Sequence, residues 1–236
     1  MKLEIGNRGK LRIRHEHYCF AFDKTLHVLF LSDFHFNKYS ENTVKQLIDN
    51  IDQLKIDIIL LGGDYVDTKK GLIHLERFLT KLSVKIGVFA VAGNHDYFFG
   101  IEKIKQLMVH NQVNWIEKDS IVFEFFGKTI RIDGNRLTTE NNVDFSILCM
   151  HKPIQFNKAR YTYNLIFAGH LHGSQIVFWE TEKGLYPGKL FYKWNQHKVH
   201  FGSCLMLISK GLGDTIPIRY NCNKELVLVN INNIKL

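Results

Sequence analysis

Apolar runs in the first half of the chain predict buried strands that alternate with amphipathic helices. The runs 26–32, 58–61 and 86–91 are almost continuously apolar, which is typical of strands covered on both faces. After each run, apolar residues recur at helical spacing, and Ser40 is the predicted N-cap of the first helix. The helical positions are Val44, Leu47, Ile48, Ile51 and Leu54, then Leu72, Leu75, Phe78, Leu79 and Leu82, then Ile101, Ile104, Leu107 and Met108. This alternation favours a layered α/β fold with a largely parallel sheet.

The second half of the chain is rich in strand patterns and contains little helix. Segments 120–126 and 128–133 flank Gly127, which predicts a hairpin with a tight turn. Further strands are predicted at 145–150, 165–168, 203–208 and 226–231. We therefore expect a second, β-rich sheet packed on the first. No repeat or linker interrupts the pattern, so residues 1–236 are expected to form one domain.

Composition excludes several classes of protein. The chain has 236 residues, of which 45% are hydrophobic and 23% charged, and this rules out a disordered or fibrous protein. The four cysteines form no Cys-x-x-Cys pair, which argues against a disulfide scaffold or a zinc ribbon. No apolar run approaches the ~18 residues of a membrane span, and the basic N-terminal stretch does not resemble a secretory signal. A soluble, cytoplasmic protein is expected.

The net charge points to an anionic partner. Lys and Arg number 31 against 23 Asp and Glu, a formal charge of +8. Such an excess favours a phosphate substrate, nucleic acid or an anionic membrane surface, and it does not rank the three.

Polar clusters follow the predicted strands, where open α/β sheets carry their catalytic groups. Taken singly, each cluster is explained by a turn, a cap or a structural histidine. Five such clusters, each beside glycine or at a strand end, favour a metal site instead. Imidazole, carboxylate and amide ligands without a thiolate suit Mn, Fe, Zn or Co. The clusters are Ser32-Asp33-Phe34-His35, Gly62-Gly63-Asp64-Tyr65-Val66-Asp67, Gly93-Asn94-His95-Asp96, Met150-His151-Lys152-Pro153 and Gly169-His170-Leu171-His172-Gly173.

In this order, the clusters resemble the calcineurin-like metallophosphoesterase superfamily. Its pattern is Asp-x-His, Gly-Asp-x-x-Asp, Gly-Asn-His-Asp or -Glu, a lone His and Gly-His-x-His, and the match across 33–172 is complete. The resemblance implies a two-sheet βαβ sandwich flanked by helices and two divalent metal ions, with manganese the first choice. The implied ligands are Asp33, His35, Asp64 and His172 for one ion, and Asp64 as a bridge with Asn94, His151 and His170 for the other.

The resemblance also implies roles for residues outside the ligand set. His95 would be the general acid or a phosphate contact, and Asp67 would orient it. Asp96 either adds to this arrangement or is a local helix cap, and the sequence leaves both open. Thr68-Lys69 stands where the protein Ser/Thr phosphatases have Arg-Gly, so that class of phosphatase is not expected.

The C-terminal half resembles a narrower bacterial branch of the superfamily. The segment 169–175 is similar to its GHTHGGQ signature, and 209–213, 217–219 and Glu225 are similar to its SRGLG…PIR…PE ending. Ser174, Lys210 and Lys224 replace the Gly, Arg and Pro of that pattern, and none of the three is a predicted ligand. The branch includes enzymes that hydrolyse the pyrophosphate of UDP-2,3-diacylglucosamine in lipid A synthesis.

A charge count relates the implied ligand set to its substrate. Asp33 and Asp64 contribute two negative charges, and two divalent ions contribute four positive ones. A bridging hydroxide would leave a single positive charge, which matches a phosphodiester monoanion. The expected reaction is therefore attack of a metal-bridging hydroxide on a phosphodiester or pyrophosphate, with His95 assisting the leaving oxygen. The alternatives are a metal-dependent nuclease or nucleotide phosphodiesterase and, less favoured, a non-catalytic scaffold.

The segment 176–202 is aromatic and basic, and we interpret it as a rim for an acylated or membrane-embedded substrate. The alternative is that these aromatic residues pack on the second sheet. Peripheral contact with an anionic inner-membrane surface is a further expectation. Aromatic residues interleaved with lysine also occur in single-strand nucleic-acid grooves, but the C-terminal resemblance ranks nucleic acid below a lipid substrate. Predicted substrate contacts are Tyr97, Trp194 and Arg219, the last equally explained as a structural ion pair.

Overall fold

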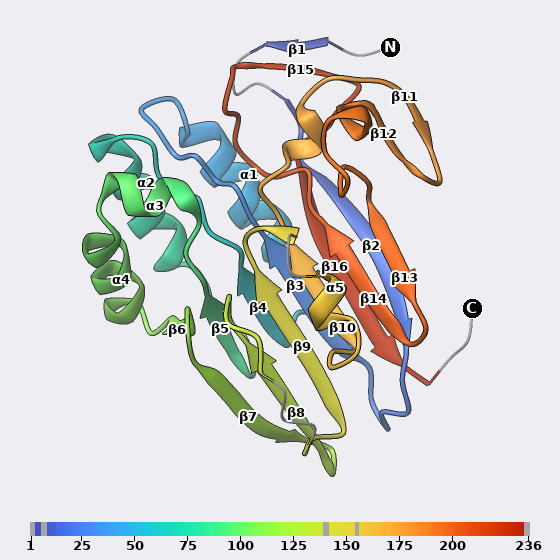
Figure 1. The fold of residues 1–236 in the computed structure, drawn as a ribbon. Helices are drawn as coiled ribbons and strands as arrows, with labels where there is room; N and C mark the ends of the chain where they lie inside the picture. The colour runs from blue at the N-terminus through green and yellow to red at the C-terminus, as the bar shows by residue number, and fades with distance from the viewer. Residues whose placement is uncertain (1–2, 6–8, 139–141, 154–155, 234–236) are drawn as a thin grey trace.

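Two six-stranded sheets lie face to face in the computed structural model, which describes residues 3–5, 9–138, 142–153 and 156–233 (Figure 1). The first sheet has the order β2 (Arg12–Cys19), β16 (Glu225–Asn232), β3 (Leu26–Leu31), β4 (Ile58–Leu61), β5 (Gly87–Ala90) and β6 (Asn114–Trp115). The second has the order β13 (Lys198–Phe201), β14 (Cys204–Ile208), β10 (Leu165–Ala168), β9 (Phe145–Met150), β8 (Lys128–Asp133) and β7 (Ser120–Phe125).

Helices cover the outer face of the first sheet. These are α1 (Glu41–Ile51), α2 (Lys69–Leu79), α3 (Asn94–Phe99) and α4 (Ile101–His110), and the short α5 (Phe156–Ala159) lies on the second sheet (Figure 1). Two small sheets complete the description, β1 (Leu3–Ile5) with β15 (Ile218–Tyr220) and β11 (Val177–Thr181) with β12 (Gly184–Pro187). Short 3-10 turns are η2 (His172–Ser174) and η3 (Gly188–Leu190). The predicted two-sheet α/β class is confirmed.

Alternation along the buried strands explains why their sequences are apolar throughout. On β3, Val28 and Phe30 face the core between the sheets, whereas Leu29 and Leu31 face the helical layer. The rings of Phe30 and Phe167 meet across the two sheets at 5.2 Å between centroids. Both faces of β3 are thus removed from water, as the apolar run 26–32 predicts.

The parallel pairing aligns the carboxyl ends of the strands that precede the polar clusters. In the first sheet β3, β4 and β5 run parallel. In the second sheet β9 and β10 run parallel. Each set of loops therefore leaves its sheet at one edge.

The position of β16 corrects the predicted strand arrangement. The segment 226–231 was expected in the second sheet, yet β16 lies in the first, parallel to β2 and antiparallel to β3. Val227 and Val229 face the core between the sheets, while Leu226 and Leu228 face the helical side. Such two-sided burial is available inside either sheet, so the apolar pattern did not distinguish them.

Two smaller differences have local causes. Strand β2 was not predicted, because it lies at a sheet edge and reads Arg-Ile-Arg-His-Glu-His, with its apolar signal weakened by charge. Ser40 occupies the N-cap position of α1, but its hydroxyl accepts from the backbone N–H of Asn37 instead of capping the helix.

We predict that Phe30→Ala lowers the free energy of unfolding by about 3–5 kcal/mol, because it opens a cavity between the two sheets. The measurement is urea denaturation followed by circular dichroism. The control is Ile73→Ala on α2, where the side chain is 65% exposed; its effect should stay within about 0.5 kcal/mol. Equal effects of the two substitutions would contradict the described core.

Candidate metal centre

The polar clusters of both sheets meet at one site. Asp33 and His35 follow β3, Asp64 and Asp67 follow β4, and Asn94 and His95 begin α3 after β5. From the second sheet, His151 follows β9, and His170 and His172 follow β10. The seven predicted ligands converge into two clusters that share a carboxylate.

The ligand loops adopt backbone conformations that residues other than glycine rarely take. Positive φ angles occur at Asp33 (55°), His35 (45°), Asp64 (56°), His170 (73°) and His172 (50°). A non-glycine residue held there costs about 1–3 kcal/mol, and such residues persist where surrounding structure holds them. Backbone hydrogen bonds do this here, because Asp33 N donates to Gly63 O at 3.0 Å and His35 N donates to Asp64 O at 2.9 Å.

The first cluster consists of Asp33, His35 and His172, all buried. Nε2 of His35 lies 3.2 Å from Nε2 of His172, which in turn lies 3.6 Å from Asp33 Oδ1. Nδ1 of His35 donates to Asp67 Oδ1 at 2.8 Å, so its Nε2 is left to act as a ligand atom. Burial alone lowers the pKa of His35, but the Asp67 hydrogen bond and nearby carboxylates raise it overall. Asp67 thus makes His35 a more basic ligand.

The second cluster consists of Asp64, Asn94, His151 and His170. Nδ1 of His151 donates to Gly62 O at 2.8 Å, which leaves its Nε2 facing the other three residues. From that Nε2, Asp64 Oδ2 is at 3.3 Å, Asn94 Oδ1 at 3.1 Å and His170 Nδ1 at 3.2 Å. A lone pair surrounded by acceptor atoms requires a cation, and this donor set therefore fits a divalent metal.

Asp64 lies between the two clusters. Its Oδ2 is 3.3 Å from His151 Nε2 and 3.7 Å from His35 Nε2, so one oxygen faces both sets of ligands. Its other oxygen, Oδ1, accepts from the backbone N–H of His95 at 2.8 Å. This is the position that a carboxylate bridging two ions would take.

Protonation of the metal-free ligands fits the same interpretation. Burial opposes charge on His151, but its hydrogen bond to Asp64 and the carboxylate charges raise its pKa to about 9. Burial, with the charges of His151 and Lys152, lowers the pKa of His170 to about 4. Burial also lowers the pKa of His172 to about 4. At neutral pH the last two imidazoles are neutral and ready to ligate, whereas metal binding would displace the proton held at His151.

Asp96 is the local helix cap, one of the two alternatives that the sequence left open. Its Oδ2 accepts from the backbone N–H groups of Gly93 at 2.7 Å and Asp64 at 2.8 Å, and its Oδ1 accepts from Tyr65 N at 2.8 Å. Burial raises its pKa to about 7 against these hydrogen bonds. Asp96 therefore caps α3 and also ties the Asp64 loop to it.

His95 borders the cavity, but Asp67 lies closer to His35 than to His95. The distance from Asp67 Oδ1 to His95 Nδ1 is 3.4 Å, against 2.8 Å to His35 Nδ1. The His95 side chain is 39% exposed. Orientation of His95 by Asp67 stays a prediction.

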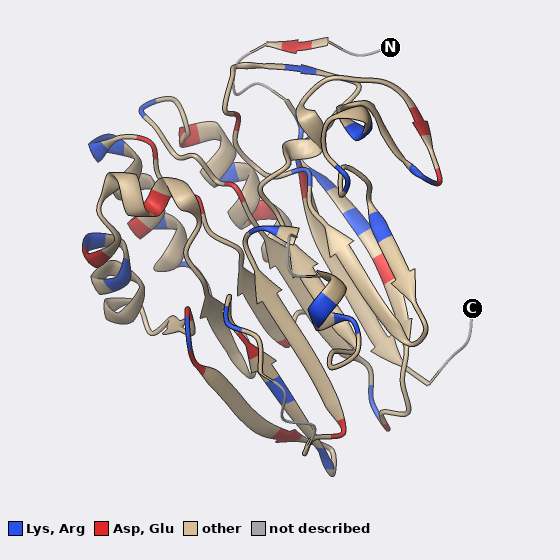
Figure 2. Ribbon diagram, in the orientation of Figure 1, with Lys and Arg blue, Asp and Glu red and all other residues tan. Residues whose placement is uncertain are grey.

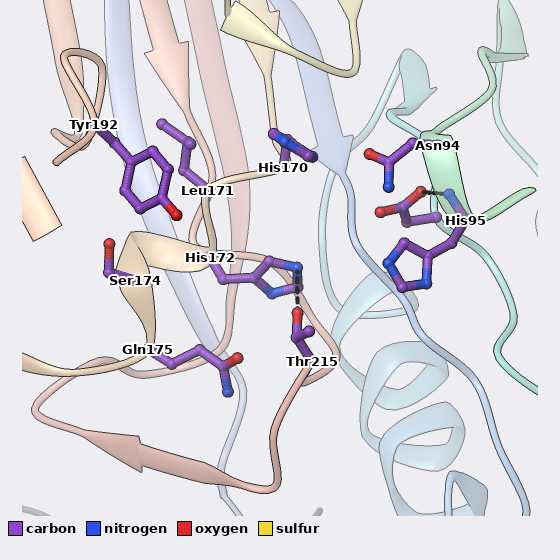
Figure 3. Close-up of a pocket in the computed structure, with 10 residues that line it drawn as sticks. Asn94, His95, His170, Leu171, His172, Ser174, Gln175, Tyr192 and Thr215 are labelled. Atoms are coloured by element: carbon purple, nitrogen blue, oxygen red, sulfur yellow. Dashed lines mark hydrogen bonds between the residues drawn. The ribbon is translucent and has the colours of Figure 1, made fainter.

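A cavity of about 330 Å³ opens over the two clusters (Figure 3). Asn94 and His95 line one side, and Tyr192, Ser174 and the histidines of the Gly-His-Leu-His segment line the other (Figure 3). The hydroxyl of Thr215 lies 3.4 Å from His172 Nε2. Tyr192 belongs to the segment 176–202 that was interpreted as a rim, whereas the sequence did not single out Thr215 or Ser174 as lining residues.

The three predicted substrate contacts lie in different surroundings. Tyr97 is exposed, and its hydroxyl donates to Glu117 Oε1 at 3.0 Å. Trp194 is partly buried and packs edge-on against Phe156 at 5.1 Å between ring centroids. Arg219 is only 1% exposed, and its guanidinium bonds Asp214 Oδ1 and Gly213 O, both at 2.6 Å. Arg219 thus forms the structural ion pair that was its alternative, and the structure brings neither it nor Trp194 to the cavity wall.

In the described part of the chain, no helix has both the length and the apolar character needed to cross a membrane.

Comparison with known proteins gives three informative relatives. An uncharacterized metallophosphoesterase of Helicobacter pylori is 25% identical over 240 residues, covering 91% of this chain and 62% of its own length. The phosphodiesterase YaeI of Escherichia coli is 26% identical over 236 residues, covering 86% and 81%. The UDP-2,3-diacylglucosamine pyrophosphatase LpxG of Chlamydia muridarum is 28% identical over 104 residues, covering 43% and 30%.

This chain therefore spans less than two thirds of the Helicobacter relative. The family model of the calcineurin-like phosphoesterases matches residues 26–174, from β3 through the Gly-His-Leu-His segment. That match covers more than half of the chain and confirms the resemblance seen in the motifs. The protein belongs to the calcineurin-like phosphoesterase family.

Proposed function

We propose that this protein is a two-metal phosphohydrolase, with residues 1–236 acting as one domain that cleaves a phosphodiester or a pyrophosphate. One observation carries the proposal: Asp64 Oδ2 faces both His151 Nε2 at 3.3 Å and His35 Nε2 at 3.7 Å, below an open cavity. Family membership and the phosphodiesterase name of one relative support it. The complete ligand set argues against a non-catalytic scaffold.

The chain's own residues would divide the work as follows. Asp33, His35, Asp64 and His172 would hold one ion, and Asp64, Asn94, His151 and His170 the other. When bound, the two ions would polarise the phosphoryl oxygens and supply the nucleophile. We propose manganese, while iron, zinc and cobalt suit the same ligands. His95, on the cavity wall, would give a proton or a hydrogen bond to the leaving oxygen.

A lipid-linked substrate would account for the exposed apolar residues that precede Tyr192 in the chain. Tyr192 lines the cavity, and its neighbours Leu190 and Phe191 are 70% and 78% exposed. Exposed apolar side chains next to a phosphate site suit a substrate with acyl chains. The pyrophosphatase relative, whose named substrate is UDP-2,3-diacylglucosamine, supports the same class. We therefore propose a substrate of that kind, met at an anionic membrane surface.

A nuclease or nucleotide phosphodiesterase is the second candidate. Figure 2 shows Lys and Arg spread over both sheets, the helices and the loops of the described residues, rather than gathered on one element. Nucleic-acid binding depends on clustered cationic contacts to phosphates. The lipid-linked substrate is therefore the first choice.

We predict that Asp64→Asn abolishes Mn²⁺-dependent hydrolysis of bis-p-nitrophenyl phosphate, because the amide replaces a charged oxygen shared by both clusters. Circular dichroism should show a retained fold. Asp49→Asn on the exposed face of α1 is the control and should keep wild-type turnover. Unchanged turnover of the Asp64 variant would exclude the proposed centre.

A second prediction separates the roles of Asp67 and His95. Asp67→Ala should weaken metal affinity about 10–100-fold, because it removes the hydrogen bond that orients His35. His95→Gln should keep the metal affinity and lower kcat about 10²–10⁴-fold, as expected for loss of a general acid. Competition with a fluorescent chelator measures the affinity. Loss of metal in the His95 variant, or its retention in the Asp67 variant, would reverse the assignment.

A third prediction concerns the membrane. The wild-type protein should float with vesicles that contain phosphatidylglycerol, and Phe191→Asp should reduce the floated fraction several-fold, since it places a negative charge on the exposed apolar rim. Phe98→Asp offers a comparison, since Phe98 is an equally accessible aromatic residue (88% exposed) on α3. No flotation of the wild type would count against membrane contact while leaving the hydrolase assignment in place.

A further inference from the structure

A second cavity, of about 260 Å³, adjoins the metal centre. Asn94 and His151 line both this cavity and the ligand cluster, so the second predicted ion would lie at its inner wall. Tyr97, Asn135, Met150 and Lys152 supply the remaining polar and large side chains. Apart from the proposed ligands and the predicted substrate contact Tyr97, none of its lining residues has a role assigned above.

Lys152 is the cationic group of the second cavity. It follows His151 directly and is partly buried. Among the described residues, no carboxylate forms an ion pair with it. A lysine in a cavity wall without a paired carboxylate favours an anionic ligand there.

The walls around Lys152 are held by a hydrogen-bond network. Glu117 accepts from Ala92 N at 2.6 Å, from Asn135 Nδ2 at 2.9 Å and from the Tyr97 hydroxyl at 3.0 Å. Asn135 Oδ1 in turn accepts from His151 N at 2.8 Å. The Glu117 carboxylate is therefore occupied by three donors, while Asn135 couples the cavity to a ligand of the metal centre.

The two cavities share Asn94 in their walls and differ in the chemistry of their other lining residues. The first is lined by the hydroxyl-bearing residues Ser174, Tyr192 and Thr215 and has no Lys or Arg in its wall. The second has Lys152. A substrate that extends into both would be bound in one direction, with its more anionic side toward Lys152.

We infer that the second cavity binds a further phosphoryl group attached to the scissile phosphate, with Lys152 as its cationic contact. The inference rests on the proposed hydrolase function and adds to it the residue that would distinguish a pyrophosphate diester from a simple phosphodiester. Such a substrate carries two negative charges. The ligand set with two ions and a hydroxide has a net charge of +1 and balances only one of them. Lys152 supplies the second positive charge, and the apolar part of the substrate extends toward Tyr192.

The inference is tested by measuring how nucleotides inhibit hydrolysis of a chromogenic phosphodiester. Bis-p-nitrophenyl phosphate hydrolysis with Mn²⁺ is measured against UMP, which has one phosphate, and UDP, which has two. In wild-type protein UDP should be the stronger inhibitor. Lys152→Met should weaken UDP inhibition about tenfold relative to UMP inhibition, as expected for a lost charge-assisted hydrogen bond. Lys152→Arg should restore most of the difference.

Lys103→Met, on the exposed side of α4, is the matched control and should leave the UMP-to-UDP ratio at its wild-type value. Equal weakening of UMP and UDP by Lys152→Met, or no weakening of either, would overturn the subsite. If the wild-type protein hydrolyses the reporter but UDP and UMP inhibit it equally, the subsite is also overturned, while the proposed function stands. Failure of the wild type to hydrolyse the reporter would contradict the proposed function itself, and the subsite with it.

Discussion

The loops after β4 and β5 lie against each other backbone to backbone, and the geometry of the metal centre depends on this contact. A Cβ atom on Gly63 would lie 2.2 Å from Gly93 N, and one on Gly93 would lie 2.1 Å from Asp64 Oδ1. Only glycine permits so close an approach. Asp96 strengthens the contact by accepting from Gly93 N and Asp64 N. Asp64 is thereby held where both ligand clusters reach it.

The backbone strain and the buried charges of the ligand cluster destabilise the folded state. Packing in the surrounding fold offsets this loss of stability. Five of its residues have positive φ angles, and most of its charged or titratable groups are buried. The core between the sheets and the helical layer hold the strands that carry these residues. In the metal-free protein, Asp64, whose pKa is held below its usual range, pairs with His151, whose pKa is raised to about 9. In the metal-free protein, the proton on His151 thus lies beside the Asp64 carboxylate, and a bound metal ion would displace that proton.

Around this centre the protein is asymmetric. One cavity includes the hydroxyl-bearing residues Ser174, Tyr192 and Thr215 in its wall, and the other contains Lys152. The residues proposed as ligands are therefore bordered by two cavities that differ in the charge of their lining residues. Those surfaces, rather than the shared ligands, would determine which phosphoester the protein accepts.

The sequence by itself predicted the central strands of both sheets, most helices and the residues proposed as ligands. Continuous apolar runs mark strands buried on both faces, and parallel strands bring the polar residues after them to one edge, so Asp33, Asp64 and Asn94 were predictable as neighbours. Tertiary structure alone decided what depends on packing between distant segments. It put β16 in the first sheet, turned Arg219 inward to Asp214, gave Asp67 to His35 and brought Tyr192 to the cavity. The physical reason is that spacing along a strand specifies alternate faces, whereas the direction of a side chain on a loop is set by contacts with residues far away in the chain.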